Sequence, residues 1–155
     1  MGRKMITHVL SMTFPMKPKP VQSVQFRGKK AYQPNDIKQF KAEVKYHFRK
    51  EFPDFEVLKE VPLLLLVVYK YSMAKLDDWK QEYILIHGHY PKITRPDVTD
   101  NLNKGLVDAL SGEIWEDDGI ICQIEARKIY APKTEIKIMV SQLTVPTTKK
   151  EYDLL

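Results

Sequence analysis

The stretch Val61-Pro62-Leu63-Leu64-Leu65-Leu66-Val67-Val68-Tyr69 decides the fold of this chain. It is nine residues long, whereas a membrane-spanning helix needs roughly 20 apolar residues, so the run excludes an integral membrane protein. The apolar residues are partly β-branched and begin directly after a proline, which favours a strand. We therefore predict a short buried strand over Leu63–Tyr71.

Two further runs on the C-terminal side alternate between apolar and polar residues. Residues Ile120–Tyr130 alternate, and Glu135–Leu143 alternate again after the turn sequence Pro132-Lys133-Thr134. Alternation on both sides of a tight turn is typical of an antiparallel hairpin. On the N-terminal side, residues 5–14 predict a first strand. The prolines that follow, up to Pro20, indicate an extended segment, with a short strand at 21–26 and a turn at 27–30 after it.

Three segments have helical spacing of their apolar residues. The first runs from Asn35 or Asp36 to about Phe52, the second covers 75–87, and the third runs from about Thr99 to Leu110 and stops at Gly112. The residues expected to face inward are Ile37, Phe40, Val44 and Phe48 in the first, Leu76, Trp79 or Lys80, Tyr83 and Ile86 or His87 in the second, and Leu102, Leu106, Ala109 and Leu110 in the third.

These elements predict an α+β fold in two layers. One mixed β-sheet carries helices packed on a face and ends in the C-terminal antiparallel hairpin. Residues 1–155 form a single domain, and the tail from about residue 144 is expected to fray. The only cysteine, Cys122, excludes an internal disulfide framework and fits a reducing compartment, so we expect a cytoplasmic protein. Its place in an alternating strand predicts a packed core thiol.

The charge of the chain is unevenly distributed. The first 50 residues hold twelve basic residues and two acids, a local net charge of +10, whereas the remainder carries a net charge of −5. A basic segment is usually a solvated face, but it can also bind the phosphates of a nucleic acid. The candidate DNA-binding residues in this segment are Lys17, Lys19, Arg27, Lys29 and Lys30.

An acidic segment follows at residues 97–118, with seven acids and one base, Lys104. Asp97 and Asp100 stand at the start of the predicted third helix, where capping alone would explain them. Asp100, Lys104 and Asp108 have the spacing i, i+4, i+8 on one helix face, where an ion-pair ladder is the simpler interpretation.

The pair Asp117-Asp118 is harder to explain without a ligand. A short return strand beside the helix would bring Asp118 back near Asp97. Carboxylates gathered in this way repel one another, and a hard divalent cation such as Mg²⁺ relieves the repulsion. Other sites are weaker, because His87 and His89 indicate a surface turn, and no glycine-rich loop predicts a nucleotide cofactor.

The acidic segment, with Asp97, Asp100-Asn101-Leu102, Lys104, Asp108-Ala109-Leu110 and Asp117-Asp118 in order, resembles the signature of RusA-like Holliday junction resolvases. The stretch Phe14–Pro20, followed by Arg27–Pro34, is similar to the opening of the phage-type members. The family's motif has one residue between its first two acids, whereas two separate Asp97 and Asp100 here. Asp97 therefore matches only if a one-residue bulge restores its direction.

This resemblance implies a magnesium-dependent endodeoxyribonuclease that acts as a homodimer on four-way DNA junctions in recombination and repair, with Mn²⁺ as a substitute metal. The matching positions imply that Asp97, Asp100 and Asp118 hold the metal and that Lys104 assists catalysis. Asn101, Asp108 and Asp117 match positions of a supporting shell. Two other classes stay open: a non-catalytic branched-DNA-binding module, and a metal-dependent flap or single-strand nuclease without junction preference.

Overall fold

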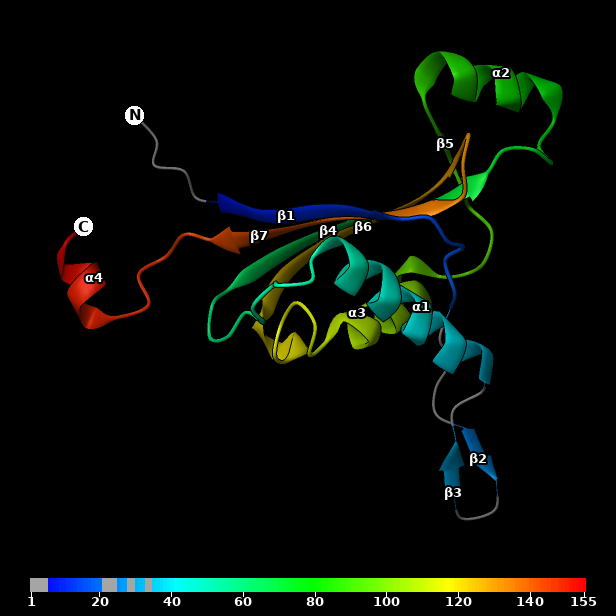
Figure 1. Cartoon of the computed structure of the whole chain (residues 1–155). Coiled ribbons are helices and arrows are strands. Elements are labelled where there is room, and N and C mark those ends of the chain that lie inside the picture. The colour runs from blue at the N-terminus through cyan, green and yellow to red at the C-terminus, as the bar shows by residue number, and fades with distance from the viewer. Residues whose placement is uncertain (1–5, 21–24, 28–29, 33–34) are drawn as a thin grey trace.

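A computed structural model describes residues 6–20, 25–27, 30–32 and 35–155. Figure 1 shows one twisted sheet with helices on it, which confirms the predicted α+β class. The elements are β1 (Ile6–Phe14), β2 (Gln25–Arg27), β3 (Lys30–Tyr32), α1 (Asn35–Glu51), β4 (Leu63–Ser72), α2 (Asp78–His87), β5 (Tyr90–Pro91), a π-helical turn η1 (Val98–Leu102), α3 (Asn103–Leu110), a 3₁₀ turn η2 (Asp118–Ile120), β6 (Ile121–Ala131), β7 (Glu135–Leu143) and α4 (Lys149–Asp153).

The strand β4 occupies the middle of the five-stranded sheet, whose order is β1-β7-β4-β6-β5. It pairs in parallel with β6 and antiparallel with β7. The two C-terminal strands, β6 and β7, run antiparallel and are joined by a short turn, as expected. They do not pair with each other, however, because β4 lies between them in the sheet. The reason is that Leu63, Leu64 and Leu65 are all buried, and a strand that buries both faces belongs at the centre of a sheet.

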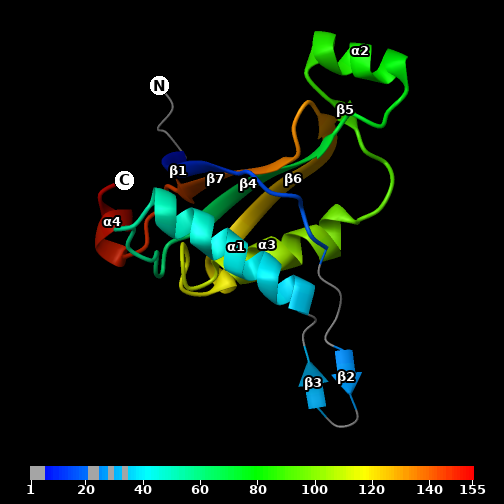
Figure 2. The ribbon, with the colours of Figure 1, turned by 45° about the vertical axis from the view of Figure 1, so that its right-hand side comes forward.

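The core lies between the sheet and the helices α1 and α3, which cover the same face (Figures 1 and 2). The buried residues predicted for these helices are confirmed: Ile37, Phe40, Val44 and Phe48 in α1, and Leu102, Leu106, Ala109 and Leu110 at the start of and along α3. All of these residues except Ile37 belong to one buried cluster with Leu65, Val67 and Tyr69 of β4. This packing fixes α3, and with it the acidic segment, against the sheet.

The helix α2 lies apart from α1 and α3, beside the far end of the sheet (Figure 1). Our prediction of a helix here is confirmed, but its predicted inner face is wrong. Ile84 is its only buried residue, whereas Trp79, Tyr83 and Ile86 are exposed. The helix contacts the body of the domain through the short β5 rather than lying on a sheet face, so no apolar stripe is covered.

Two smaller predictions also need correction. Cys122 is exposed rather than packed in the core, because β5 pairs with only two residues at the far end of β6 and leaves its beginning as a sheet edge. The predicted third helix begins as the π-helical turn η1 before the α-helix proper. The tail contains the short helix α4, whose residues are all exposed. No helix in the described parts of the chain combines the length and apolar character needed to cross a membrane.

Candidate metal and nucleic-acid site

The first half of the acidic segment lies at the N-terminal end of α3. Asp97 is exposed, and its carbonyl oxygen accepts a hydrogen bond from the backbone N–H of Leu102 at 3.1 Å, which closes η1. Asp100 lies within η1, and its side chain is outside the described part of the structure. Asn101 is half-buried and Lys104 is exposed at the start of α3. The backbone thus presents this end of α3 to solvent.

A lysine of the sheet holds the loop that leads to Asp97. The Nζ of Lys128 donates hydrogen bonds to the carbonyl oxygens of Thr94 and, at 2.7 Å, of Pro96. Lys128 lies on β6 beside Tyr69 of β4, in the row of side chains that faces the helices. Sequence analysis missed this residue, although a lysine in the helix-facing row of an alternating strand is a signal that it has a specific partner.

A tyrosine of the core fixes the start of α3. The hydroxyl of Tyr69 donates a hydrogen bond of 2.7 Å to Oδ1 of Asn103. Burial raises the pKa of Tyr69, so the hydroxyl stays protonated and remains a donor. A buried hydroxyl without a partner is costly, and this bond therefore helps to specify where α3 begins on the sheet.

The second half of the acidic segment gathers three carboxylates near η2. The pKa of Asp118 is raised because hydrogen bonding to Asp117 favours its protonated form, with slight desolvation and the negative charges of Asp117 and Asp108 adding to the effect. Asp117 also accepts a hydrogen bond of 3.4 Å from the backbone N–H of Gly119. Asp117 and Asp108 therefore both lie within electrostatic reach of Asp118, and their charges disfavour its ionised form.

The expected return strand from Gly112 to Asp118 is not formed. Instead the backbone of Leu58 bonds to Ile114 and Glu116 on either side of Trp115. Ile114 and Trp115 are fully buried, so the segment turns into the core rather than running extended beside α3. Asp118 therefore lies near Asp108. The turn η2 comes after the C-terminal end of α3, whereas Asp97 comes before its N-terminal end (Figure 1).

The donor chemistry of this acidic surface fits a hard divalent cation. Carboxylates that repel one another at the surface supply oxygen ligands and gain from a cation between them. Within the described residues, however, no group of three or more acidic, histidine or cysteine side chains has the geometry to hold a metal ion. The structure places Asp117 and Asp108 within electrostatic reach of Asp118, whereas Asp97 is not among the charges that raise the pKa of Asp118.

The predicted DNA-binding residues belong to the stretch of chain between β1 and α1. Lys17 is exposed after β1, and Lys19 forms an ion pair of 2.6 Å with Asp36 at the start of α1. Arg27 and Lys30 belong to the ribbon of β2 and β3, of whose side chains nothing is described. Lys29 lies outside the described residues.

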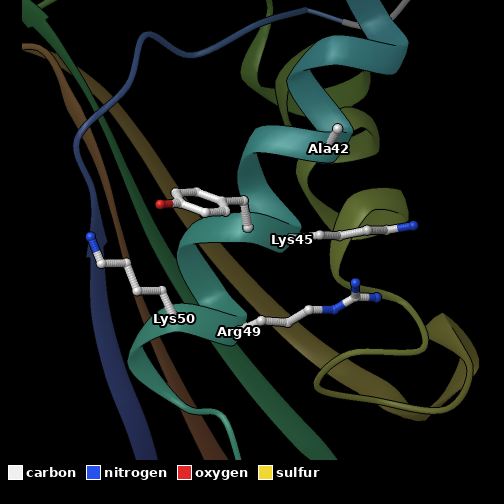
Figure 3. A pocket seen from close by; sticks show the side chains of 5 residues that line it. Ala42, Lys45, Arg49 and Lys50 are labelled. Carbon is white, nitrogen blue, oxygen red and sulfur yellow. The ribbon is translucent and has the colours of Figure 1, made fainter.

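A second basic surface lies along α1. A shallow open hollow is lined there by Ala42, Lys45, Tyr46, Arg49 and Lys50. Figure 3 shows Lys45 and Arg49 extending toward the side of α3, while Lys50 extends the other way. The guanidinium of Arg49 forms an ion pair with both carboxylate oxygens of Glu113, and Lys41 lies 3.8 Å from Asp108. Two basic side chains of α1 thus hold the acidic segment in place.

The contact of Lys128 gives a first testable prediction. Replacing Lys128 by Met keeps the aliphatic stem and removes the donor to the Thr94 and Pro96 carbonyls, so the loop before Asp97 loses its anchor. We expect a loss of about 1–3 kcal/mol in the free energy of unfolding, measured by urea titration. Lys133→Met, at an exposed lysine of the β6–β7 turn, is the matched control. Equal stability of the two variants would show that the bonds of Lys128 do not hold the loop.

Comparison with known proteins shows a match to one protein family. The family model described as Endodeoxyribonuclease RusA matches residues 14–141 of the 155-residue chain. The match covers the end of β1, the basic segment, α1, the complete acidic segment and the strands β4, β6 and most of β7. No curated protein matches the chain significantly.

Proposed function

The chain belongs to the RusA endodeoxyribonuclease family, and from this membership we propose that it is a divalent-metal-dependent endonuclease that resolves four-way DNA junctions. The observation that carries the proposal is the family match over residues 14–141, which contains the acidic and the basic segments together. Repelling carboxylates support a metal-assisted reaction, and a basic N-terminal region supports a polyanionic substrate. The setting would be the cytoplasm, in DNA recombination and repair.

In this proposal Asp97, Asp100 and Asp118 would hold Mg²⁺, or Mn²⁺ in its place. The bound metal would supply an activated water nucleophile and stabilise charge on the leaving 3′ oxygen. Lys104 places its ammonium beside the scissile phosphate, where it stabilises the charge that develops during attack. Asn101, Asp108 and Asp117 orient the carboxylates, and Lys128 fixes the loop before Asp97. The nearness of Asp108 to Asp118 makes Asp108 an alternative ligand to Asp97.

We further propose that the enzyme works as a homodimer, because resolving a four-way junction requires cuts in two strands at two related positions. Two copies related by a two-fold axis would present two equivalent acidic sites to the two strands. Lys17, Lys19, Arg27, Lys29 and Lys30 would bind the phosphate backbone without reading its sequence.

A cleavage panel tests the proposal. Four-way, flap, linear duplex and single-stranded DNA are incubated with the protein in Mg²⁺ and, separately, in a chelator. A junction resolvase cuts the four-way substrate in paired positions, and only with metal. Equal cutting of flaps or single strands would indicate a nuclease without junction preference. Binding that is independent of metal, with all substrates left intact, would indicate a DNA-binding module.

The salt dependence of binding provides a second prediction. If Lys17, Lys29 and Lys30 contact phosphates, replacing all three by Gln should reduce the slope of log affinity against log salt by about 3, since each contact contributes roughly 0.9. The preference for junctions over duplex should survive as a ratio, because backbone contacts position DNA without reading its shape. Fluorescence anisotropy in chelator over a range of salt concentrations measures both quantities.

The matched comparison is a triple variant of the second basic surface, with Lys38, Lys45 and Lys50 of α1 replaced by Gln. All three lie on α1 outside the ion pairs of Lys41 and Arg49. The slope of log affinity against log salt is compared in the two triple variants. If it is unchanged in the N-terminal variant and reduced in the α1 variant, the DNA backbone is bound by α1 instead.

A further inference from the structure

The helix α2 carries more exposed apolar surface than a helix of this size normally leaves uncovered. Only Ile84 is buried, while Trp79 and Tyr83 are 58% and 43% exposed. The described parts of the chain place nothing over this surface, and Figure 2 shows α2 standing clear of the two core helices. An exposed surface of this kind indicates that α2 meets a partner.

Three aromatic rings at this end of the molecule pack together, and we call Trp79, Tyr83 and Tyr90 the aromatic platform. The rings of Trp79 and Tyr90 meet edge to face at 6.1 Å between centroids, and those of Tyr83 and Tyr90 do so at 5.7 Å. Edge-to-face packing fixes each ring by its neighbour. The side chains are therefore held in place although Trp79 and Tyr83 are exposed.

Lysines accompany the rings. The Nζ of Lys80 lies 5.4 Å from the ring centroids of both Trp79 and Tyr90. The Nζ of Lys92 lies 5.0 Å from the Tyr71 ring and 4.9 Å from the Tyr130 ring, and it donates a hydrogen bond of 3.1 Å to the Tyr130 hydroxyl. That bond lowers the pKa of Tyr130 below its ordinary value. The ammonium groups of Lys80 and Lys92 therefore lie against aromatic rings rather than extending freely into solvent.

The combination of rings and lysines favours a nucleic acid over a protein as the partner. Lysine is depleted in the cores of protein interfaces, whereas aromatic rings interleaved with cations form the surfaces on which unpaired bases stack. The helix itself carries Asp78 and Glu82 against Lys80, so it has no excess of positive charge with which to follow a phosphate backbone. The chemistry suits the flat face of a base, and the neighbouring lysines suit the phosphate beside it.

The aromatic platform is also joined directly to the acidic segment. Tyr90 lies in β5, and Asp97 follows seven residues later, within about 25 Å even for a fully extended chain. The loop between them is tied to β6 by Lys128 and by the backbone bond from Lys92 to the Lys128 carbonyl. A DNA branch that contacts Asp97 would therefore need to extend no more than about 25 Å to meet Tyr90.

We propose that the aromatic platform of α2 and β5 binds branched DNA by stacking on bases at the branch point that lack a stacking neighbour. This proposal rests on the proposed function, since it assigns a second contact region for the same substrate. The rings recognise the open face of a base, which a four-way junction or a single strand exposes and a continuous duplex does not. The platform would thus contribute to the preference for branched over linear DNA.

Tryptophan fluorescence tests the proposal, because the two tryptophans differ in exposure. Trp115 is fully buried, so accessible emission reports on Trp79. In chelator, where no cleavage occurs, adding a four-way junction or a thymine oligonucleotide should quench Trp79 and protect it from acrylamide, while a linear duplex should do neither. Trp79→Ala should weaken junction binding roughly tenfold, within the range found for loss of a base-stacking ring, and duplex binding less than twofold.

Ile86→Ala, equally exposed on the same helix, is the matched control and should leave junction binding unchanged. Equal losses of junction and duplex affinity in Trp79→Ala, or no loss at all, would overturn the proposal. So would protection of Trp79 that rises with protein concentration without DNA, since a second copy would then cover α2. Junction cleavage in Mg²⁺ without quenching of Trp79 would support the proposed nuclease function and contradict base stacking on the platform. Quenching without cleavage would support the platform and contradict the nuclease function.

Discussion

Asp118→Asn should abolish cleavage of four-way junctions while leaving junction binding unchanged or slightly tighter. The substitution is nearly isosteric and removes one negative charge from a surface that would face phosphates in the proposed complex, so binding has no electrostatic reason to fall. If Asp118 holds the metal as proposed, the metal loses an anionic ligand and the chemical step fails. Single-turnover cleavage in Mg²⁺ and anisotropy in chelator measure the two effects separately.

Asp117→Asn is the matched control, because its position is adjacent and its main contact is structural. The Asp117 carboxylate accepts a hydrogen bond from the Gly119 N–H, which an Asn side-chain oxygen can also accept. We expect it to retain cleavage well above Asp118→Asn. Wild-type turnover of Asp118→Asn would remove that residue from the site, and an inactive Asp108→Asn beside an active Asp97→Asn would make Asp108 the ligand.

The stability of Asp118→Asn provides an internal check on folding. Since the pKa of Asp118 is raised in the folded protein by Asp117 and Asp108, its ionised form is disfavoured there. The fold therefore loses stability as pH rises through that pKa, and the loss is absent below the ordinary pKa of an aspartate, 3.8. At neutral pH in chelator the Asn variant should melt no lower than the wild type, and at strongly acidic pH the two should converge.

The sequence predicts which segments form strands and helices better than it predicts which strands lie next to one another in the sheet. The run Leu63–Tyr69 identifies a buried strand because burial on both faces leaves no polar alternation. The residues of that run do not indicate which strands pair with it, so the position of β4 between β6 and β7 was not predicted. Periodicity reports which face of an element is apolar, whereas strand order depends on contacts between distant parts of the chain.

The errors at Cys122 and in α2 have a common physical cause. Both predictions assumed that an apolar pattern is covered by the rest of the chain. Cys122 lies on the part of β6 that β5 does not reach, and α2 buries only Ile84. Sheet edges and projecting helices break this assumption, because no other part of the described chain covers them.

The chemistry of the candidate site was visible in the sequence, but its geometry was not. Asp117-Asp118 in a turn predicted mutual repulsion, and the raised pKa of Asp118 agrees with it. The path from α3 to this turn was wrong because Ile114 and Trp115 are adjacent apolar residues that are both buried, which is incompatible with an exposed return strand. A pair of neighbouring large apolar residues in a polar loop is the signal that could have corrected the path.

Lys104→Ala should slow the chemical step by roughly 30- to 1,000-fold and weaken junction binding much less. A cation beside the scissile phosphate stabilises the transition state by about 2–4 kcal/mol, because the charge it faces develops only during attack. Single-turnover cleavage at saturating protein measures the rate, and anisotropy in chelator measures the affinity. Lys104→Arg keeps the charge and should recover part of the rate.

Lys41→Ala distinguishes this role from the ion-pair ladder that the spacing of Asp100, Lys104 and Asp108 also allows. In the structure the ion pair of Asp108 is formed with Lys41, on α1, and not with Lys104. Loss of Lys41 should therefore lower the melting temperature slightly and spare the rate, whereas loss of Lys104 should spare the melting temperature and lower the rate. If Lys104→Ala instead behaves like Lys41→Ala, Lys104 belongs to the ladder, and the charge on the attacked phosphate must be stabilised by another group.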